Sequence, residues 1–394
     1  MSSSRDETSS TVEHGPVSAP PGLRGFTVAE TELGDVRGAE GFFHYRQYDA
    51  IELAQKRTFE DVWFLLMDGQ LPSAGQRNQF LLELGQLRRI PDEVPGLLQE
   101  VARLPAKAPL AGERAAMSLA AAALGLRPAL DYSREELRSQ CLQLSALAPT
   151  VFAALHRLRS DRPPIEPVAH LGHAANYLYM LEGEEPDEVR ERALERYWVA
   201  TIDHGFNAST FTARVIASTR ADVGAAIVGA LGALSGPLHG GAPGRVWEML
   251  DEIGTAERAD EWLRAKLERG ERIMGFGHAV YRTEDPRSRL LRSVAQRLGG
   301  PRVDLARHVE EQSLELLREL RPGHDLYTNV EFYASIVLEA VGLPPDLFTP
   351  TFALSRMVGW SAHILEQLAN PRIIRPAARY VGPDPPVPVP DPDG

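Results

Sequence analysis

The chain has 394 residues, of which 43% are hydrophobic and 24% charged, a composition typical of a soluble globular protein large enough for one or two domains. The formal net charge of −12 argues against a dedicated binder of nucleic acid or anionic membranes, because such partners need a basic surface. No apolar run reaches the roughly 18 residues of a membrane span, and the single cysteine, Cys141, favours a reducing compartment, so we expect a cytoplasmic protein.

The two ends of the chain differ in composition from the rest. Residues 1–21 are rich in Ser, Thr, Glu and Pro, and residues 383–394 consist of Pro, Asp, Val and Gly. Neither has a periodic apolar face, so both are predicted to be disordered tails. Segments 25–31 and 42–45 alternate in polarity and are separated by the turn signal Gly34-Asp35, which predicts one small hairpin.

Most of the chain between the tails has apolar residues at the three-to-four spacing of amphipathic helices. We predict helices at 58–67, 78–87, 113–124, 135–144, 187–203, 221–235, 246–253, 258–269, 288–298, 304–320, 329–340 and 351–368. The helices between 246 and 320 are shorter and more charged, which suggests a smaller, more exposed domain. The prediction is therefore a mainly α, two-domain fold with a minor N-terminal β element. Its large domain comprises 22–240 and a return segment 339–382, and its small domain comprises 241–338.

Two histidines lie in glycine-rich turns, where a ligand can approach the backbone closely. His239 lies in Gly-Pro-Leu-His-Gly-Gly-Ala, and His278 follows Gly-Phe-Gly. Arg287 comes just after Asp285-Pro286, a helix start that favours an anion. Taken alone, each histidine could be a structural turn residue and the arginine a solvated one. Together they indicate a site that polarises carbonyls and binds carboxylates.

An acidic residue and a buried-looking arginine extend this candidate site. Glu331 is in the first turn predicted after Asn329, where it could complement the helix dipole or act as a general base. Arg356 shares a helix stripe with His363, and an arginine on an apolar helix needs an anion to tolerate burial. His363 itself is predicted to be a core histidine with satisfied hydrogen bonds.

A metal site is not expected. His170 and His173 are predicted to share one helix face, but no third ligand stands at a recognisable spacing. Gly275 and Gly277 lack the third glycine and the preceding strand of a dinucleotide-binding fingerprint.

From Gly22 to about Gly382 the chain resembles the citrate synthase family. The segments that carry the resemblance occur in the family's order: Gly-Leu-Arg-Gly at 22–25, Tyr-Arg-x-Tyr-Asp at 45–49, Gly-Glu-Glu-Pro-Asp at 183–187, Asp-His-Gly-x-Asn-Ala-Ser-Thr at 203–210, 236–242, 275–287, and Arg-Ile-Ile-Arg-Pro at 372–376. The resemblance implies a mostly helical fold with a mobile small domain and an intertwined homodimer with shared active sites. It implies condensation of acetyl-CoA with oxaloacetate to citrate, with the CoA thioester as a substrate and neither cofactor nor metal.

The resemblance also implies residue roles. His239 would hydrogen-bond the thioester oxygen, His278 would polarise the oxaloacetate ketone, and Glu331 would be the base. The oxaloacetate would be held by His204, Arg287, Arg356 and, from the other subunit, Arg375. The CoA nucleotide would meet Arg282 and the loop Met274, Gly275, Phe276 and Gly277.

One residue departs from the family pattern, in which the base is an aspartate in Asn-Val-Asp-Phe-Tyr, whereas this chain has Glu331. Three alternatives follow from the sequence. The donor could be propionyl-CoA, which would make the chain a 2-methylcitrate synthase or an enzyme of dual specificity. The glutamate could mark a low-activity homologue that only binds oxaloacetate or CoA. The apolar helices alone would also fit a helical interaction protein.

Overall fold

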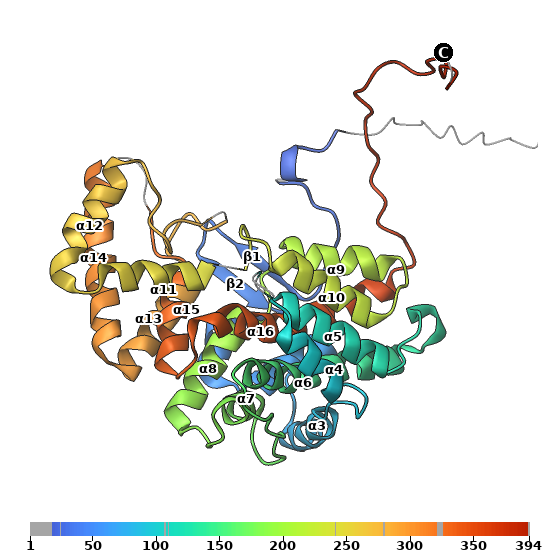
Figure 1. The fold of residues 1–394 in the computed structure, drawn as a ribbon, viewed down its shortest axis with the longest axis horizontal. Helices are drawn as coiled ribbons and strands as arrows, with labels where there is room; N and C mark the ends of the chain where they lie inside the picture. Colours follow the sequence, from blue (N-terminus) through green and yellow to red (C-terminus); the bar gives the residue numbers. More distant parts are fainter. Residues whose placement is uncertain are drawn as a thin grey trace, which may run out of the picture.

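The structure is a computed structural model that describes residues 18–23, 25–105, 108, 110–240, 242–278, 280–320 and 326–392, so most of the predicted tail 1–21 lies outside the described residues. Over this part of the chain there are sixteen α-helices and one three-stranded sheet (Figure 1), which confirms the predicted mainly helical fold.

The helices and strands follow one another along the chain in this order. The first half has β1 (Gly34–Arg37), β2 (Phe42–Tyr45), β3 (Tyr48–Asp49), α1 (Ala50–Lys56), α2 (Phe59–Asp68), α3 (Ala74–Leu87), α4 (Pro95–Arg103), α5 (Ala111–Ala123), α6 (Arg134–Arg159), α7 (His173–Glu182) and α8 (Glu188–Thr201). The second half has α9 (Ala208–Ser218), α10 (Val223–Leu234), α11 (Ala242–Ile253), α12 (Ala256–Glu268), α13 (Pro286–Leu298), α14 (Pro301–Leu320), α15 (Val330–Ala340) and α16 (Phe348–Ala369).

One of the two strands predicted for the hairpin is present and the other is not. Residues 25–31 form no strand, and the expected turn at Gly34-Asp35 is itself the start of β1, which pairs antiparallel with β2. The chain instead turns between β1 and β2, where Gly41 adopts a φ of 64° that favours glycine. Alternation of polarity located β2 correctly but could not say which neighbouring segment would pair with it.

The core of the larger part of the molecule lies between α6 and α16. Almost every side chain of α16 is buried, and the hydroxyls of Ser145 on α6 and Ser361 on α16 lie 3.0 Å apart. Helix α6 runs to Arg159, well beyond the predicted end at 144. It continues past Pro149 because the residues around that proline are all buried, and tertiary packing outweighs the lost backbone hydrogen bond.

Helices α11 to α15 pack mainly on one another and form a lobe at the left of Figure 1, from which α12 and α14 project. Helices α13 and α15 also contact α8, and α11 contacts α16. Helix α15 ends at Ala340, just past the predicted domain boundary at 338. The described residues after α16 form neither helix nor strand, and Figure 1 shows them leaving the body of the molecule.

Candidate active site

The loop that carries His278 is fastened to the segment that carries Glu331. Gly275 and Gly277 both have a φ of 80°, and a Cβ on Gly275 would lie 2.9 Å from the side chain of Phe332, so glycine is required there. The backbone N–H of Gly277 donates to the carbonyl of Tyr327 at 2.9 Å, and that of Asn329 donates to the carbonyl of Gly275 at 2.8 Å. His278 and Glu331 therefore belong to one rigid unit.

His278 is a neutral hydrogen-bond donor. The backbone N–H groups of Val280 and Tyr281 both donate to its Nδ1 at 3.0 Å, so the proton of the neutral ring sits on Nε2. Burial, followed by the Arg287 guanidinium, lowers the pKa of His278 to about 4. The Nη2 of Arg287 lies 3.2 Å from Nε2, and because a guanidinium can only donate, this contact is not a hydrogen bond when Nε2 carries the proton. The ring can thus donate from Nε2 to a carbonyl oxygen without first being charged.

His239 is the second neutral donor and is held by the first turn of α9. The backbone N–H of Ser209 donates to its Nε2 at 3.3 Å, which places the ring proton on Nδ1. The Ser209 hydroxyl lies 2.9 Å from the same Nε2 and 2.7 Å from the Oδ1 of Asn207, and it accepts a hydrogen bond from Trp360 at 3.2 Å. Burial, followed by Arg356, lowers the pKa of His239 to about 4.

Two buried arginines contribute positive charge. Arg287 is 3% exposed and is clamped by Asp285, which accepts from its Nε at 3.0 Å and from its Nη2 at 2.9 Å. Although burial opposes the charge, Asp285 raises the pKa of Arg287. Arg356 is 2% exposed, donates from Nε to the carbonyl of Thr201 at 2.8 Å and lies over the ring of Phe352. Burial lowers its pKa, and among the described residues no carboxylate lies within 4.0 Å of it.

His204 connects these groups. Its ring centroid lies 5.8 Å from that of His278 and 5.6 Å from that of Tyr281, whose hydroxyl is 3.0 Å from the Nε2 of His204. Burial, followed by Arg287 and Arg356, lowers the pKa of His204 well below its usual value, so the ring is neutral. The site thus combines three neutral imidazoles with two buried guanidiniums.

Glu331 is the carboxylate of this set. Its backbone N–H donates to the Oδ1 of Asn329 at 3.1 Å, which starts α15, and part of its side chain remains accessible. Burial is the main reason that the pKa of Glu331 is raised to about 7; Arg287 and Arg356 oppose this rise, and Asp285 adds to it. A carboxylate with a pKa near neutrality is suited to general-base work.

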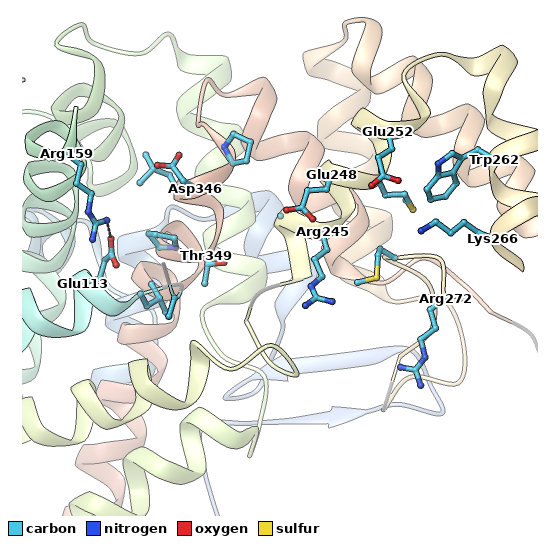
Figure 2. Close-up of a pocket in the computed structure, with 18 residues that line it drawn as sticks. Glu113, Arg159, Arg245, Glu248, Glu252, Trp262, Lys266, Arg272, Asp346 and Thr349 are labelled. Carbon is cyan, nitrogen blue, oxygen red and sulfur yellow. Dashed lines mark hydrogen bonds and ion pairs between the residues drawn. The ribbon is translucent and has the colours of Figure 1, made fainter. Parts of the chain in front are cut away.

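Two residues expected at the site are not brought there within this chain. Arg375 is exposed in the segment after α16, and Arg282 is exposed, with its backbone N–H donating to the carbonyl of Gly38 at 3.0 Å. Met274 does face a cleft, which has a volume of about 740 Å³ and is shown in Figure 2.

This cleft separates the two parts of the molecule. One wall holds Glu113, Arg159, Asp346 and Thr349, and the other holds Arg245, Glu248, Glu252, Trp262, Lys266 and Arg272 (Figure 2). Sequence patterns did not single out the three cations Arg245, Lys266 and Arg272. The cleft is large enough for part of a nucleotide-bearing ligand.

Other site residues were also missed from the sequence. Ser209 and Tyr281 had no signal beyond their place beside predicted histidines. His363 has partners at both nitrogens, as predicted: Arg214 at 3.1 Å and Asp203 at 3.2 Å. His363, on α16, is thereby hydrogen-bonded both to Arg214 on α9 and to Asp203, the residue before His204.

The proposed helix face shared by two histidines is wrong. Helix α7 begins at His173, after the cap residue Gly172, so His170 lies outside it and pairs with Glu185 at 2.8 Å. His173 is stacked on Phe59. In the described part of the chain no group of three or more His, Cys, Asp or Glu side chains is placed to hold a metal ion. Nor is any helix there long and apolar enough to span a membrane.

Comparisons with known proteins agree with this chemistry. The family model described as citrate synthase, C-terminal domain, matches residues 22–377. The citrate synthase of Haloferax volcanii is 39% identical over 363 residues, which cover 92% of this chain and 95% of that protein.

Solved structures are similar over almost the whole chain. Citrate synthase from Pyrobaculum aerophilum has a TM-score of 0.85 and 33% identity and covers 94% of each chain. A citrate synthase from Thermoplasma acidophilum, in a ternary complex with carboxymethyl coenzyme A and oxaloacetate, has a TM-score of 0.85 and 27% identity, over 94% of this chain and 98% of that one. The chain therefore belongs to the citrate synthase family, whose enzymes transfer acyl groups in a condensation reaction.

Proposed function

We propose that this enzyme condenses acetyl-CoA with oxaloacetate and then hydrolyses the resulting thioester, which releases citrate and CoA. The observation that carries the proposal is the pairing of Glu331, a carboxylate with a pKa of about 7, with two neutral histidine donors and two buried arginines. The bound carboxymethyl coenzyme A and oxaloacetate of the Thermoplasma acidophilum relative support the choice of substrates.

In the proposed reaction, Glu331 takes a proton from the methyl group of the thioester. A carboxylate is too weak a base to do this in water, so the negative charge that develops on the thioester oxygen must meet a preorganised donor. The Nδ1–H of His239 supplies that donor, because Ser209 holds the other ring nitrogen. The methylene carbon then forms a bond to the ketone carbon of oxaloacetate. The electron pair of the C=O π bond moves to the ketone oxygen, which takes the proton of His278 Nε2 and becomes the hydroxyl of the product. Water then adds to the thioester carbonyl carbon, the C–S bond breaks and CoA leaves as the thiol, while the proton gained by Glu331 and the one lost by His278 are exchanged with solvent.

The arginines hold the two carboxylates of oxaloacetate. Arg287 and Arg356 are buried, and the second has no carboxylate within 4.0 Å among the described residues, so an incoming dianion offsets their charge. His204, neutral and beside Arg287, adds a hydrogen bond. Met274 and the adjoining cleft, with the cations Arg245, Lys266 and Arg272, would accept the CoA moiety.

A direct test measures release of the CoA thiol from acetyl-CoA with and without oxaloacetate. Oxaloacetate-dependent release that Glu331→Gln abolishes, and that the exposed control Glu315→Gln retains, supports the proposal. Parallel assays with propionyl-CoA decide the donor. A higher kcat/KM for propionyl-CoA would make the enzyme a 2-methylcitrate synthase, and no release with either donor would refute a condensing activity.

A homodimer with shared sites is the second part of the proposal. Arg375 lies in a segment that leaves the body of its own subunit (Figure 1), so its contribution would be made to a partner. Helix α10 is built almost wholly of small and apolar residues, and Val228 and Gly229 remain partly accessible on it, which suits a close helix–helix contact.

Mixed dimers test the sharing of sites. Two inactive variants, Glu331→Gln and Arg375→Gln, are co-expressed with different tags, and the mixed dimer is purified. If Arg375 acts in the partner's site, one of the two sites in the mixed dimer is fully intact and activity returns. If Arg375 acts within its own subunit, each site keeps one defect and the mixed dimer stays inactive. A monomeric sedimentation mass would also refute the shared site.

A further inference from the structure

A buried carboxylate on α14 is hydrogen-bonded to both sides of the segment that bears Glu331. Glu310, on α14, is 5% exposed. Its Oε1 accepts a hydrogen bond from the hydroxyl of Thr328 at 2.9 Å, and its Oε2 accepts one from the hydroxyl of Tyr333 at 2.5 Å. Thr328 lies three residues before Glu331 and Tyr333 two residues after it, so one carboxylate holds the chain on either side of the proposed base.

The charge of Glu310 is compensated inside the lobe. Arg292, on α13, donates from Nε to Oε2 of Glu310 at 3.0 Å and from Nη2 to Oε1, and its Nη1 donates to Glu284 at 2.8 Å. The hydroxyl of Ser288, also on α13, donates to that of Thr328 at 2.9 Å. Four donors thus converge on the two oxygens of Glu310, which is the pattern of an ionised, fully satisfied carboxylate.

This network completes the attachment of the Glu331 segment. On the cleft side, the segment is hydrogen-bonded to the loop of His278, and the side-chain amide of Asn329 donates to the carbonyl of Gly277 at 2.9 Å. The backbone N–H of Val330 donates to Asp285, the residue that clamps Arg287. On the opposite side the attachment passes through Glu310. Buried polar networks of this kind specify one geometry more than they add stability.

We propose that Glu310 is a positioning residue for Glu331 and acts through Thr328 and Tyr333. The inference rests on the proposed function, in which Glu331 is the base. A glutamate has one more side-chain torsion than the aspartate usual in the family, so more of its placement depends on where its backbone is held. A displacement of about 1 Å at a reacting group can reduce the rate about 10²-fold.

The test replaces Glu310 by glutamine in the full chain, with Glu315→Gln, an exposed position on the same helix, as the control. Glutamine keeps the shape but has only one acceptor oxygen, so at least one hydroxyl beside Glu331 loses its partner. We expect kcat to fall about 10- to 100-fold while the KM for oxaloacetate stays within about twofold. We also expect the acid limb of the pH profile to move to lower pH, because a looser Glu331 is better solvated. Glu315→Gln should match the wild type.

Tyr333→Phe is the second variant, since it removes one hydroxyl and keeps the buried aromatic ring. It should show a smaller fall in kcat and the same direction of shift in the acid limb. The inference is overturned if Glu310→Gln and Tyr333→Phe keep the wild-type pH profile and lose activity only in proportion to lost folded protein. An inactive wild-type enzyme would refute the proposed function itself, a different result from an active wild type with unaffected variants.

Discussion

The sharpest prediction concerns the ionisation of Glu331, which we expect to set the acid limb of activity. A general base works only when deprotonated, so the rate rises with pH through its pKa, and burial places that pKa at about 7. Below this value kcat/KM should fall about tenfold per pH unit. His239 and His278, with pKa values of about 4, stay neutral across the same range and add no second limb.

Replacing Glu331 by glutamine removes the base with little change in shape. We expect a loss of about 10²- to 10⁴-fold in kcat, the usual contribution of a general base, and a flat remaining profile between pH 6 and 8. The assay is CoA thiol release at subsaturating oxaloacetate and constant ionic strength, because kcat/KM for oxaloacetate reports the pKa of the free enzyme. An acid limb near pH 7 that survives in Glu331→Gln would show that another group titrates and would refute the assignment.

The same substitution should stabilise the folded protein at high pH. Because folding raises the pKa of Glu331 above its ordinary value of 4.5, its contribution to stability is full below that value and is lost as pH rises through about 7. The difference amounts to at most on the order of 3 kcal/mol. Glu331→Gln should therefore have a higher Tm than the wild type at pH 8 and about the same Tm at pH 5. A lower Tm at pH 8 would contradict the burial argument.

Three further substitutions probe the supports of the site. Ser209→Ala removes the hydroxyl beside His239 and should lower kcat about tenfold with little change in the KM for oxaloacetate, measured by steady-state kinetics. Gly359→Ala would place a Cβ 2.1 Å from the carbonyl oxygen of Ile202, so denaturant unfolding should show a loss of about 1–3 kcal/mol or more. Glu195→Gln should raise Tm more at pH 8 than at pH 5, because burial followed by Glu60 raises the pKa of Glu195 to about 7; equal changes at both pH values would count against this.

Local patterns located twelve of the sixteen helices in the described part of the chain and the turns that carry chemistry, but gave no range for α1, α4, α7 or α9. The glycines around His278 predicted a turn that a ligand can approach closely, and in the structure both Gly275 and Gly277 have a positive φ. The cap at Asn329 located the start of α15 and the position of Glu331. These features depend on residues a few positions apart, which is the range over which caps and turns act.

The same patterns could not predict contacts between residues that are far apart in the sequence. Ser209 lies 30 positions from His239, and Glu310 lies 18 positions from Thr328. The pairing of β1 with β2 likewise depends on which segment the rest of the fold brings beside Phe42–Tyr45. A hydrogen bond between side chains on separate helices produces no periodic pattern in the sequence. The roles of Ser209 and Glu310 therefore follow only from the three-dimensional packing of the helices.

The arrangement of charges gives a physical reason for the substrates to act in order. In the empty site, Arg287 and Arg356 lower the pKa of Glu331 and thus weaken it as a base. In the proposed reaction, the two carboxylates of oxaloacetate neutralise these guanidiniums, which removes most of that effect and leaves burial dominant. Glu331 then becomes a stronger base only after oxaloacetate has bound. An enolate formed before the acceptor is present would only be reprotonated, and the same arginines that bind the acceptor keep Glu331 a weak base until the acceptor has bound.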